Sequence, residues 1–251
     1  MLGGKKEVSP MKAHRIFPRI LLLGLLGATL LSGLLGLQQR RHDRIERQRE
    51  AVVRDMVDRI HLENQAHFVV DASDFAVSGE DEYGGSSTTI RPGETFPAPD
   101  AEPGASSPST EAEDGYTLVA YGTISIPSID CELPLLDGAG VVELRYGAGR
   151  MPLSADAGEV GNLVIFGHRM KQYGSLFNRL GEVELGSRIL VSHSGESYEY
   201  VVDEILTISP AYLSRYIQNE GDSSRITLVT CTPTGVGSHR LILRGHLLTN
   251  A

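Results

Sequence analysis

Apolar and polar residues follow three successive patterns along the chain. Residues 20–37 read ILLLGLLGATLLSGLLGL, eighteen consecutive residues without a charge. Residues 38–70 are charged, lack Gly and Pro, and carry apolar residues at mostly helical spacings. From residue 116 onward, short β-branched runs alternate with segments rich in Gly, Pro, Ser and Asp. These patterns predict a membrane-spanning helix, an amphipathic helix and then a β domain.

The uncharged run over residues 20–37 lies at the lower end of the length that spans a bilayer as a helix. A secretory signal peptide is the alternative, but its apolar region is usually shorter and precedes a small-residue cleavage site. Here the run is followed directly by Gln38, Gln39, Arg40 and Arg41, which favours an uncleaved anchor. Lys and Arg flank the run on both sides, so their count does not fix its orientation.

Two segments separate this run from the β domain. The apolar stripe of residues 38–70 predicts a helix that either docks on the β domain or stands as a solvated stalk. Residues 71–115 are rich in Ser, Gly, Pro and Thr, and they contain many acidic residues but only one basic residue, Arg91. Such a composition buries too little apolar surface to offset the entropy of ordering, so we expect an acidic disordered linker.

The β domain shows strand patterns in quick succession and only short helical stretches, around residues 175–180 and 210–217. This combination predicts a mostly antiparallel β-barrel or sandwich, whereas a parallel α/β fold would need long crossover helices. The expected strands cover residues 117–126, 162–166, 188–192, 197–208, 225–230 and 240–247.

Charge and cysteine content exclude several classes of protein. The formal net charge is -9, and the β domain holds no basic run, which argues against a nucleic-acid partner. Two cysteines are too few for a disulfide scaffold and lack the short paired spacing of a structural zinc site. We interpret Cys131 as a small buried residue on a strand; a disulfide with Cys231 is the alternative, and it would abolish thiol chemistry.

Cys231 and His168 both lie where an apolar strand ends. A cysteine between a rigid strand and a Pro/Gly loop is held firmly and remains accessible, which suits a nucleophile; the alternative is an inward-packed strand end. A thiol with an ordinary pKa near 8.5 is mostly protonated at neutral pH and needs a basic or cationic neighbour. His168, in the segment VIFGHRM, is the candidate neighbour.

Arg240 begins the last strand, in which Leu241 and Leu243 alternate with Ile242 and Arg244. The two leucines are expected to face the barrel interior, which leaves Arg240 on the opposite side. A guanidinium there can donate to a carbonyl oxygen as it becomes an oxyanion, an interaction worth about 3 kcal/mol per donor in hydrolases. The alternative is a surface arginine paired with an acidic residue.

These motifs together resemble the sortase family. TLVTCTP at residues 227–233 is similar to the family signature, in which a Thr-Leu-x-Thr-Cys strand carries the nucleophile. Arg240, nine residues after Cys231, lies where the family has its arginine, and GHRM supplies the family's histidine as His168. The resemblance covers about residues 116–246.

The resemblance implies a fold and a chemistry. Sortases form an eight-stranded β-barrel and act as cysteine transpeptidases, so Cys231 would attack the Thr–Gly amide of an LPxTG-like sorting signal. An amine would then resolve the thioacyl intermediate. His168 would transfer the protons, Arg240 would hold the substrate and its oxyanion, and Thr230 would help to position the substrate. Neither a metal nor another cofactor is implied.

The resemblance also implies an organisation at the cell surface, with the N-terminus inside and the catalytic domain outside. With this orientation, the segments predicted from the residue patterns are a cytoplasmic segment (1–19), a transmembrane helix (20–37), a juxtamembrane helix (38–70), the acidic linker (71–115) and the catalytic domain (116–251).

The sequence combines motifs that resemble two different classes of sortase. TCTPTGVGSHRLILRG resembles class C, whose members polymerise pilins, whereas GHRMKQYGSLFNRL resembles class B, and Arg150 stands where many sortases have a histidine. The acceptor amine would be a pilin lysine or a peptidoglycan-precursor amine, with a slight preference for pilus assembly over wall anchoring. A hydrolytic cysteine peptidase and a non-catalytic anchored β domain that binds partners are the alternative functions.

Overall fold

The computed structural model describes residues 17–63, 67–71, 110–112, 115–172, 174–219 and 221–248. Most of the predicted acidic linker and residues 1–16 therefore lie outside the described residues. So do the side chains of residues 17–30, which include much of the predicted membrane span. In the part of the chain that is described, no helix has the length and apolar character needed to cross a membrane.

Helix α1, Phe17–Glu63, begins the described chain. The chain divides into two compact units, Met1–Arg49 and Glu50–Ala251, and the second includes the end of this helix. In that unit, Met56 is 1% exposed and packs in an apolar cluster with Phe68 and Tyr146. This end of the helix is therefore docked rather than a solvated stalk.

Residues 67–71 differ from the sequence-based prediction, which continued the helix to residue 70. They form strand β1, His67–Asp71, which pairs with β3. Phe68 and Val70 are buried while Val69 between them is 68% exposed, an alternation of period two. The apolar run that ends the predicted helix is thus an edge strand.

Eight strands close into a barrel, as predicted. Their order is β3-β4-β5-β6-β9-β10-β8-β7, and an additional pairing between β7 and β3 closes the ring. The pairs β4–β5 and β6–β9 are parallel, and the other pairs in the ring are antiparallel. The strands are β3 Gly115–Ile126, β4 Cys131–Asp137, β5 Ala148–Arg150, β6 Gly161–Phe166, β7 Arg188–His193, β8 Glu196–Ile208, β9 Ser224–Thr232 and β10 His239–Leu247.

The remaining elements are short. Strand β2, Thr110–Ala112, pairs with the beginning of β3. The helical segments are η3 Pro127–Ile129, α2 Val141–Tyr146, η4 Asn178–Glu182 and η5 Pro210–Arg215. The two short helical stretches expected from the sequence correspond to η4 and η5, and both are 3-10 helices.

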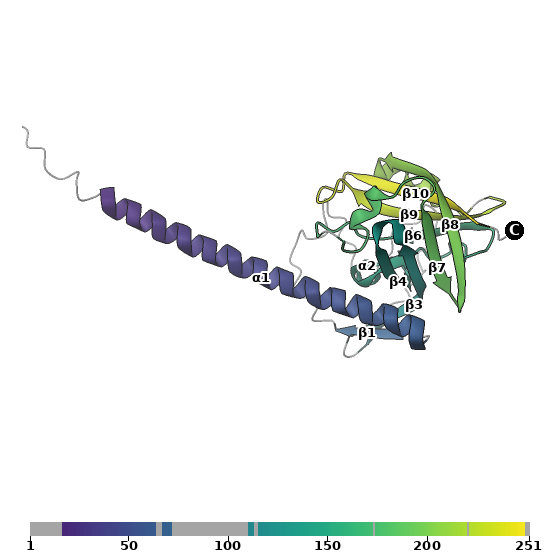
Figure 1. Cartoon of the computed structure of the whole chain (residues 1–251), viewed down its shortest axis with the longest axis horizontal. Helices are drawn as coiled ribbons and strands as arrows, with labels where there is room; N and C mark the ends of the chain where they lie inside the picture. The colour runs from purple at the N-terminus through teal and green to yellow at the C-terminus, as the bar shows by residue number, and fades with distance from the viewer. Residues whose placement is uncertain are drawn as a thin grey trace, which may run out of the picture. The chain divides into compact units, whose positions relative to one another are not determined.

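Side-chain alternation along β6, β9 and β10 separates an inner from an outer face. Inward residues such as Leu228 and Leu243 belong to the barrel core. Outward residues such as Val229 and Phe166 are covered instead by Ile217, which follows η5, so β6 and part of β9 are buried on both faces. The three strands lie side by side (Figure 1). Cys231 lies on β9 and Arg240 on β10, and His168 follows the end of β6.

Candidate active site

Cys231 lies on β9 between β10, which carries Arg240, and β6, whose end leads to His168. Arg240 and Cys231 are direct cross-strand partners in the antiparallel pair β9–β10. On the other side, β6 runs parallel to β9 with Phe166 opposite Val229, and Gly167 N donates to Val229 O at 3.1 Å. The ladder therefore continues to Gly167, the residue directly before His168, and extending the same register by two positions predicts His168 opposite Cys231.

Strand alternation predicts that the three side chains share one face of the barrel. Residues two apart on a strand share a face, so Cys231 lies on the outer face with Val229, and His168 continues the outer positions of β6. Neighbouring strands are about 4.8 Å apart, which makes adjacent positions on one face contact neighbours. Cys231, His168 and Arg240 are all partly exposed, and Cys231 is a free cysteine. Cys231 is thus a partly exposed thiol with Arg240 as its cross-strand partner, and the extended register predicts the imidazole of His168 on its other side.

Thr230 links the two strands that carry the thiol and the imidazole. Its side chain is 2% exposed, and Oγ1 donates a hydrogen bond of 2.7 Å to the carbonyl oxygen of Gly167. The sequence suggested that Thr230 contacts substrate. In the structure the hydroxyl is engaged with the backbone immediately before His168, so it holds the end of β6 against β9.

The backbone at His168 is held from its other side by Phe177. Phe177 is fully buried in the barrel core, and its N–H donates to the carbonyl oxygen of His168 at 3.0 Å. A Cβ added at Gly167 would lie 2.3 Å from the Phe177 ring, so only glycine allows this close approach. Gly167 therefore allows the buried Phe177 ring to pack directly against the backbone next to His168.

Arg240 shapes the loop between β9 and β10. Its Nη1 donates to the carbonyl oxygens of Gly237 and His239 at 2.9 and 3.1 Å. Over the described residues, no acidic side chain forms an ion pair with Arg240, which disfavours the interpretation as a paired surface arginine. In this loop-bound orientation the guanidinium still has Nε and Nη2 to offer to a substrate oxygen.

Arg169 and Thr232 were not among the residues singled out from the sequence. Each comes directly after a candidate residue, His168 and Cys231 respectively, and Arg169 Nη1 donates to Thr232 Oγ1 at 2.8 Å. Arg169 Nε also donates to the carbonyl oxygen of Asn178 at 3.2 Å. The only sequence signal was their position beside the two reactive groups.

Cys131 is separate from this chemistry. It begins β4, packs partly buried against the barrel core, and donates from Sγ to Leu176 O at 3.8 Å. Burial raises the pKa of its thiol to about 12, which keeps it protonated and unreactive. Both cysteines are free, so the interpretation as a packed strand residue is confirmed and the disulfide with Cys231 is not formed.

Arg150, where many sortases have a histidine, is engaged in the scaffold. Its guanidinium donates to Asp137 at 3.0 Å and to Asp156 at 2.6 Å, and it stacks over the Tyr121 ring at 4.8 Å. These contacts tie β4 and β5 to the loop before β6. Arg150 therefore has a structural role in this chain.

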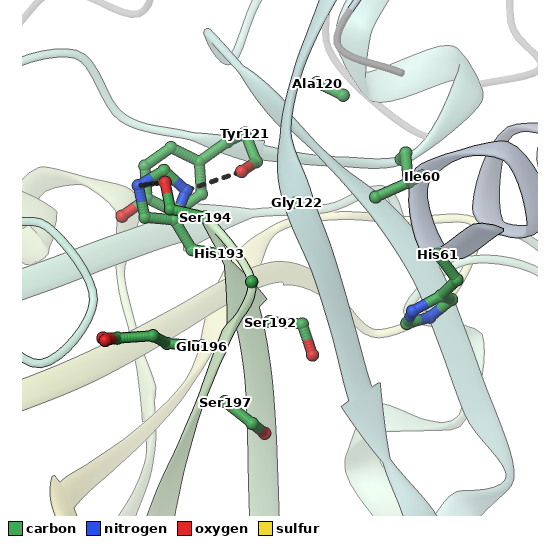
Figure 2. A pocket seen from close by; sticks show the side chains of 11 residues that line it. Ile60, His61, Ala120, Tyr121, Gly122, Ser192, His193, Ser194, Glu196 and Ser197 are labelled. Atoms are coloured by element: carbon green, nitrogen blue, oxygen red, sulfur yellow. Dashed lines mark hydrogen bonds between the residues drawn. The ribbon is translucent and has the colours of Figure 1, made fainter. Parts of the chain in front are cut away.

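A polar cleft of about 410 Å³ lies elsewhere on the barrel, at the seam between β3 and β7 (Figure 2). His193 stacks on Tyr121 with ring centroids 3.8 Å apart, and Ser194 Oγ lies 3.1 Å from His193 Nε2. None of His168, Cys231 and Arg240 lines this cleft. Among the described residues, no group of three or more His, Cys, Asp or Glu side chains is arranged to hold a metal ion.

Comparisons with known proteins cover this same region. Residues 124–248 match the family model of the sortase domain. Sortase A of Streptococcus agalactiae is 30% identical over 136 residues, which cover 53% of this chain and 54% of the relative. Sortase A of Listeria monocytogenes is 33% identical over 126 residues, which cover 50% of this chain and 55% of the relative.

A solved structure, sortase C1 of Streptococcus agalactiae, is 37% identical, with a TM-score of 0.49 and coverage of 53% of this chain and 69% of that chain. The chain spans about half the length of the two curated relatives. The motifs around His168, Cys231 and Arg240 all fall within the matched residues. The chain belongs to the sortase family.

Proposed function

We propose that this chain is a membrane-anchored transpeptidase that cleaves an LPxTG-like sorting signal and transfers the acyl part to an amine. The observation that carries the proposal is the pairing of Arg240 with Cys231, together with the β6–β9 register, whose extension predicts His168 on the other side of Cys231. The sequence motifs at the same three positions support it, as does membership of the sortase family.

In the first half-reaction, His168 accepts the proton of the Cys231 thiol, and Sγ attacks the threonine carbonyl carbon of the sorting signal. The carbonyl becomes an oxyanion, to which Arg240 donates from Nε and Nη2, an interaction worth about 3 kcal/mol per donor. When the oxyanion collapses, the Thr–Gly C–N bond breaks, and His168 supplies a proton to the departing glycine amine. The product is a thioester between the threonine acyl group and Cys231.

In the second half-reaction, an acceptor amine attacks the thioester carbonyl. His168 accepts the proton that the attacking amine loses, and Arg240 again stabilises the oxyanion. The C–S bond then breaks, which forms the new amide, and the departing sulfur of Cys231 takes the proton held by His168 and is released as the thiol. Water in place of the amine would give hydrolysis, so access of amine and water at this step decides between transpeptidase and peptidase.

We place residues 20–37 in the membrane as a single-pass anchor, with the catalytic domain on the extracellular side. The uncharged run and its charged flanks support the anchor, and the likeness to cell-surface enzymes supports the orientation. The acceptor is then an amine at the cell surface, either a pilin lysine or a peptidoglycan-precursor amine. The segment TCTPTGVGSHRLILRG, similar to class C, favours the pilin lysine.

The test uses the full chain purified in detergent, an LPxTG-type peptide, and products resolved by mass spectrometry with and without an added amine. We expect amine-dependent ligation that is lost in Cys231→Ala and His168→Ala and strongly reduced in Arg240→Gln. Arg188→Gln, an exposed arginine paired with Glu199, is the matched control and should retain activity. Supplying a lysine-containing pilin peptide and a peptidoglycan-precursor peptide in competition identifies the acceptor.

Two results would contradict the proposal. Cleavage at the same rate with and without amine, and no ligated product, would indicate a hydrolytic cysteine peptidase. Absence of any cleavage, together with resistance of Cys231 to alkylation in the folded chain, would indicate a non-catalytic β domain.

A further inference from the structure

Arg169 joins the two chain segments that carry the thiol and the imidazole. It follows His168 directly, and its Nη1 donates to the hydroxyl of Thr232, the residue directly after Cys231, at 2.8 Å. The bond spans 63 positions of sequence and lies one residue beyond each reactive group. A hydrogen bond from a charged donor is stronger than a neutral one, so this contact is well suited to fix a distance.

The guanidinium of Arg169 is held at further points. Nε donates to Asn178 O at 3.2 Å, and the Asn178 side chain in turn donates to Met170 O at 2.5 Å. A Cβ added at Gly181 would lie 2.5 Å from Arg169 Nη2, so the guanidinium rests against this glycine. The planar fork of arginine makes these contacts from a fixed geometry, which a lysine ammonium cannot reproduce.

We infer that Arg169 and Thr232 form a positioning clamp that sets the separation between His168 and Cys231. The inference rests on the proposed function, because the clamp acts through those two groups. Each clamp residue is one position away from a reacting residue, so it acts through its neighbour rather than on the substrate. Loss of the clamp would leave the barrel folded and the reactive side chains present, with their relative position less restricted.

The clamp predicts a specific pattern among variants of the full chain. Arg169→Gln and Thr232→Val should each lower kcat about tenfold and change KM less than twofold, because a small misplacement of reacting groups is costly to the chemical step. The double variant should be no slower than either single variant, since both remove the same bond. Thr232→Ser retains the acceptor hydroxyl and should restore kcat to within about twofold of wild type.

Two further variants separate geometry from charge. Arg169→Lys retains a positive charge but not the fork, so it should lose as much kcat as Arg169→Gln. Gly181→Ala should also lower kcat, because its methyl group displaces the guanidinium without altering either partner. Arg188→Gln is the control for the loss of an arginine and should match wild type.

The measurement that does not depend on transpeptidation is the rate of Cys231 alkylation by iodoacetamide, with Cys131→Ala as the common background. We expect His168→Ala to slow alkylation, and Arg169→Gln and Thr232→Val to slow it by about the same factor as they lower kcat. Urea unfolding shows which variants are folded. The alkylation rates of Cys231 are then compared among the folded variants only.

Three outcomes would overturn the clamp. The first is additive loss in the double variant, and the second is full activity of Arg169→Lys. The third is slower alkylation of Cys231 in His168→Ala together with wild-type alkylation rates in the clamp variants. That result would disprove the clamp and leave the proposed function intact. Wild-type alkylation in His168→Ala itself would overturn the proposed function, and the clamp with it.

Discussion

Gly167→Ala tests how the barrel core holds the histidine. The added Cβ would lie 2.3 Å from Phe177 Cδ2, whereas ordinary contacts begin at 3.4 Å, so the ring or the backbone must move by about 3.4 − 2.3 = 1.1 Å. Phe177 is 0% exposed and cannot move outward freely. Overpacking of this kind costs about 1–3 kcal/mol of the free energy of unfolding.

The same displacement should reach the chemistry. Phe177 N–H donates to His168 O, so movement of the ring or of Gly167 shifts the backbone that presents the imidazole. A misplacement of about 1 Å can cost on the order of 100-fold in rate, and we expect kcat/KM to fall by about 10- to 100-fold. The measurements are urea unfolding and steady-state kinetics with an LPxTG-type peptide and an amine.

Gly186→Ala supplies the matched control. Gly186 has a positive φ of 85° and no atom within 4 Å of an added Cβ, so alanine there strains the backbone without a clash. The strain costs about 1–2 kcal/mol, similar to the loss at Gly167, but the site is away from His168 and kcat/KM should be unchanged. A Gly167→Ala enzyme that is destabilised yet within threefold of wild-type kcat/KM would refute the reasoning.

Three further predictions test other parts of the structure. His168→Cys should form a disulfide with Cys231 under mild oxidation, seen by non-reducing mass spectrometry, because adjacent strand positions about 4.8 Å apart satisfy disulfide geometry; no disulfide would contradict the register. The pKa of Cys131 is raised by burial from 9.0 to about 12, so its contribution to stability is present below pH 9 and is lost as pH rises towards 12; Cys131→Ala should flatten this decline in urea unfolding. Met56→Ala should cost about 2–5 kcal/mol in unfolding free energy, whereas Val52→Ala at a 37% exposed position should cost within about 0.5 kcal/mol.

The barrel strands were predictable because strand alternation is a local property of the sequence. Residues 131–137 lacked such a signal, since Pro134 lies inside β4 and proline is usually confined to edges and bulges. The three-residue strand β5 is too short to show any alternation. The helix end was misjudged because residues 64–70 contain no Gly or Pro that would indicate a break, and two buried positions are too few to establish a strand alternation.

The candidate site was predictable only as a set of residue types in the correct order. That His168 lies level with Cys231 depends on the parallel register of β6 and β9, which no local pattern reveals. The same is true of the hydrogen bond from the Thr230 hydroxyl to the carbonyl oxygen of Gly167. Arg169 remained unnoticed because its partner becomes visible only when the two strands are placed together.

Intact-protein mass spectrometry of the full chain, after incubation with an LPxTG-type peptide in the absence of an acceptor amine, tests the central claim most directly. The account predicts an added mass equal to the peptide up to its threonine, located by proteolysis on Cys231, absent in Cys231→Ala and discharged when an amine is added. An adduct on Cys131, or cleavage of the peptide without any thioester on Cys231, would contradict it.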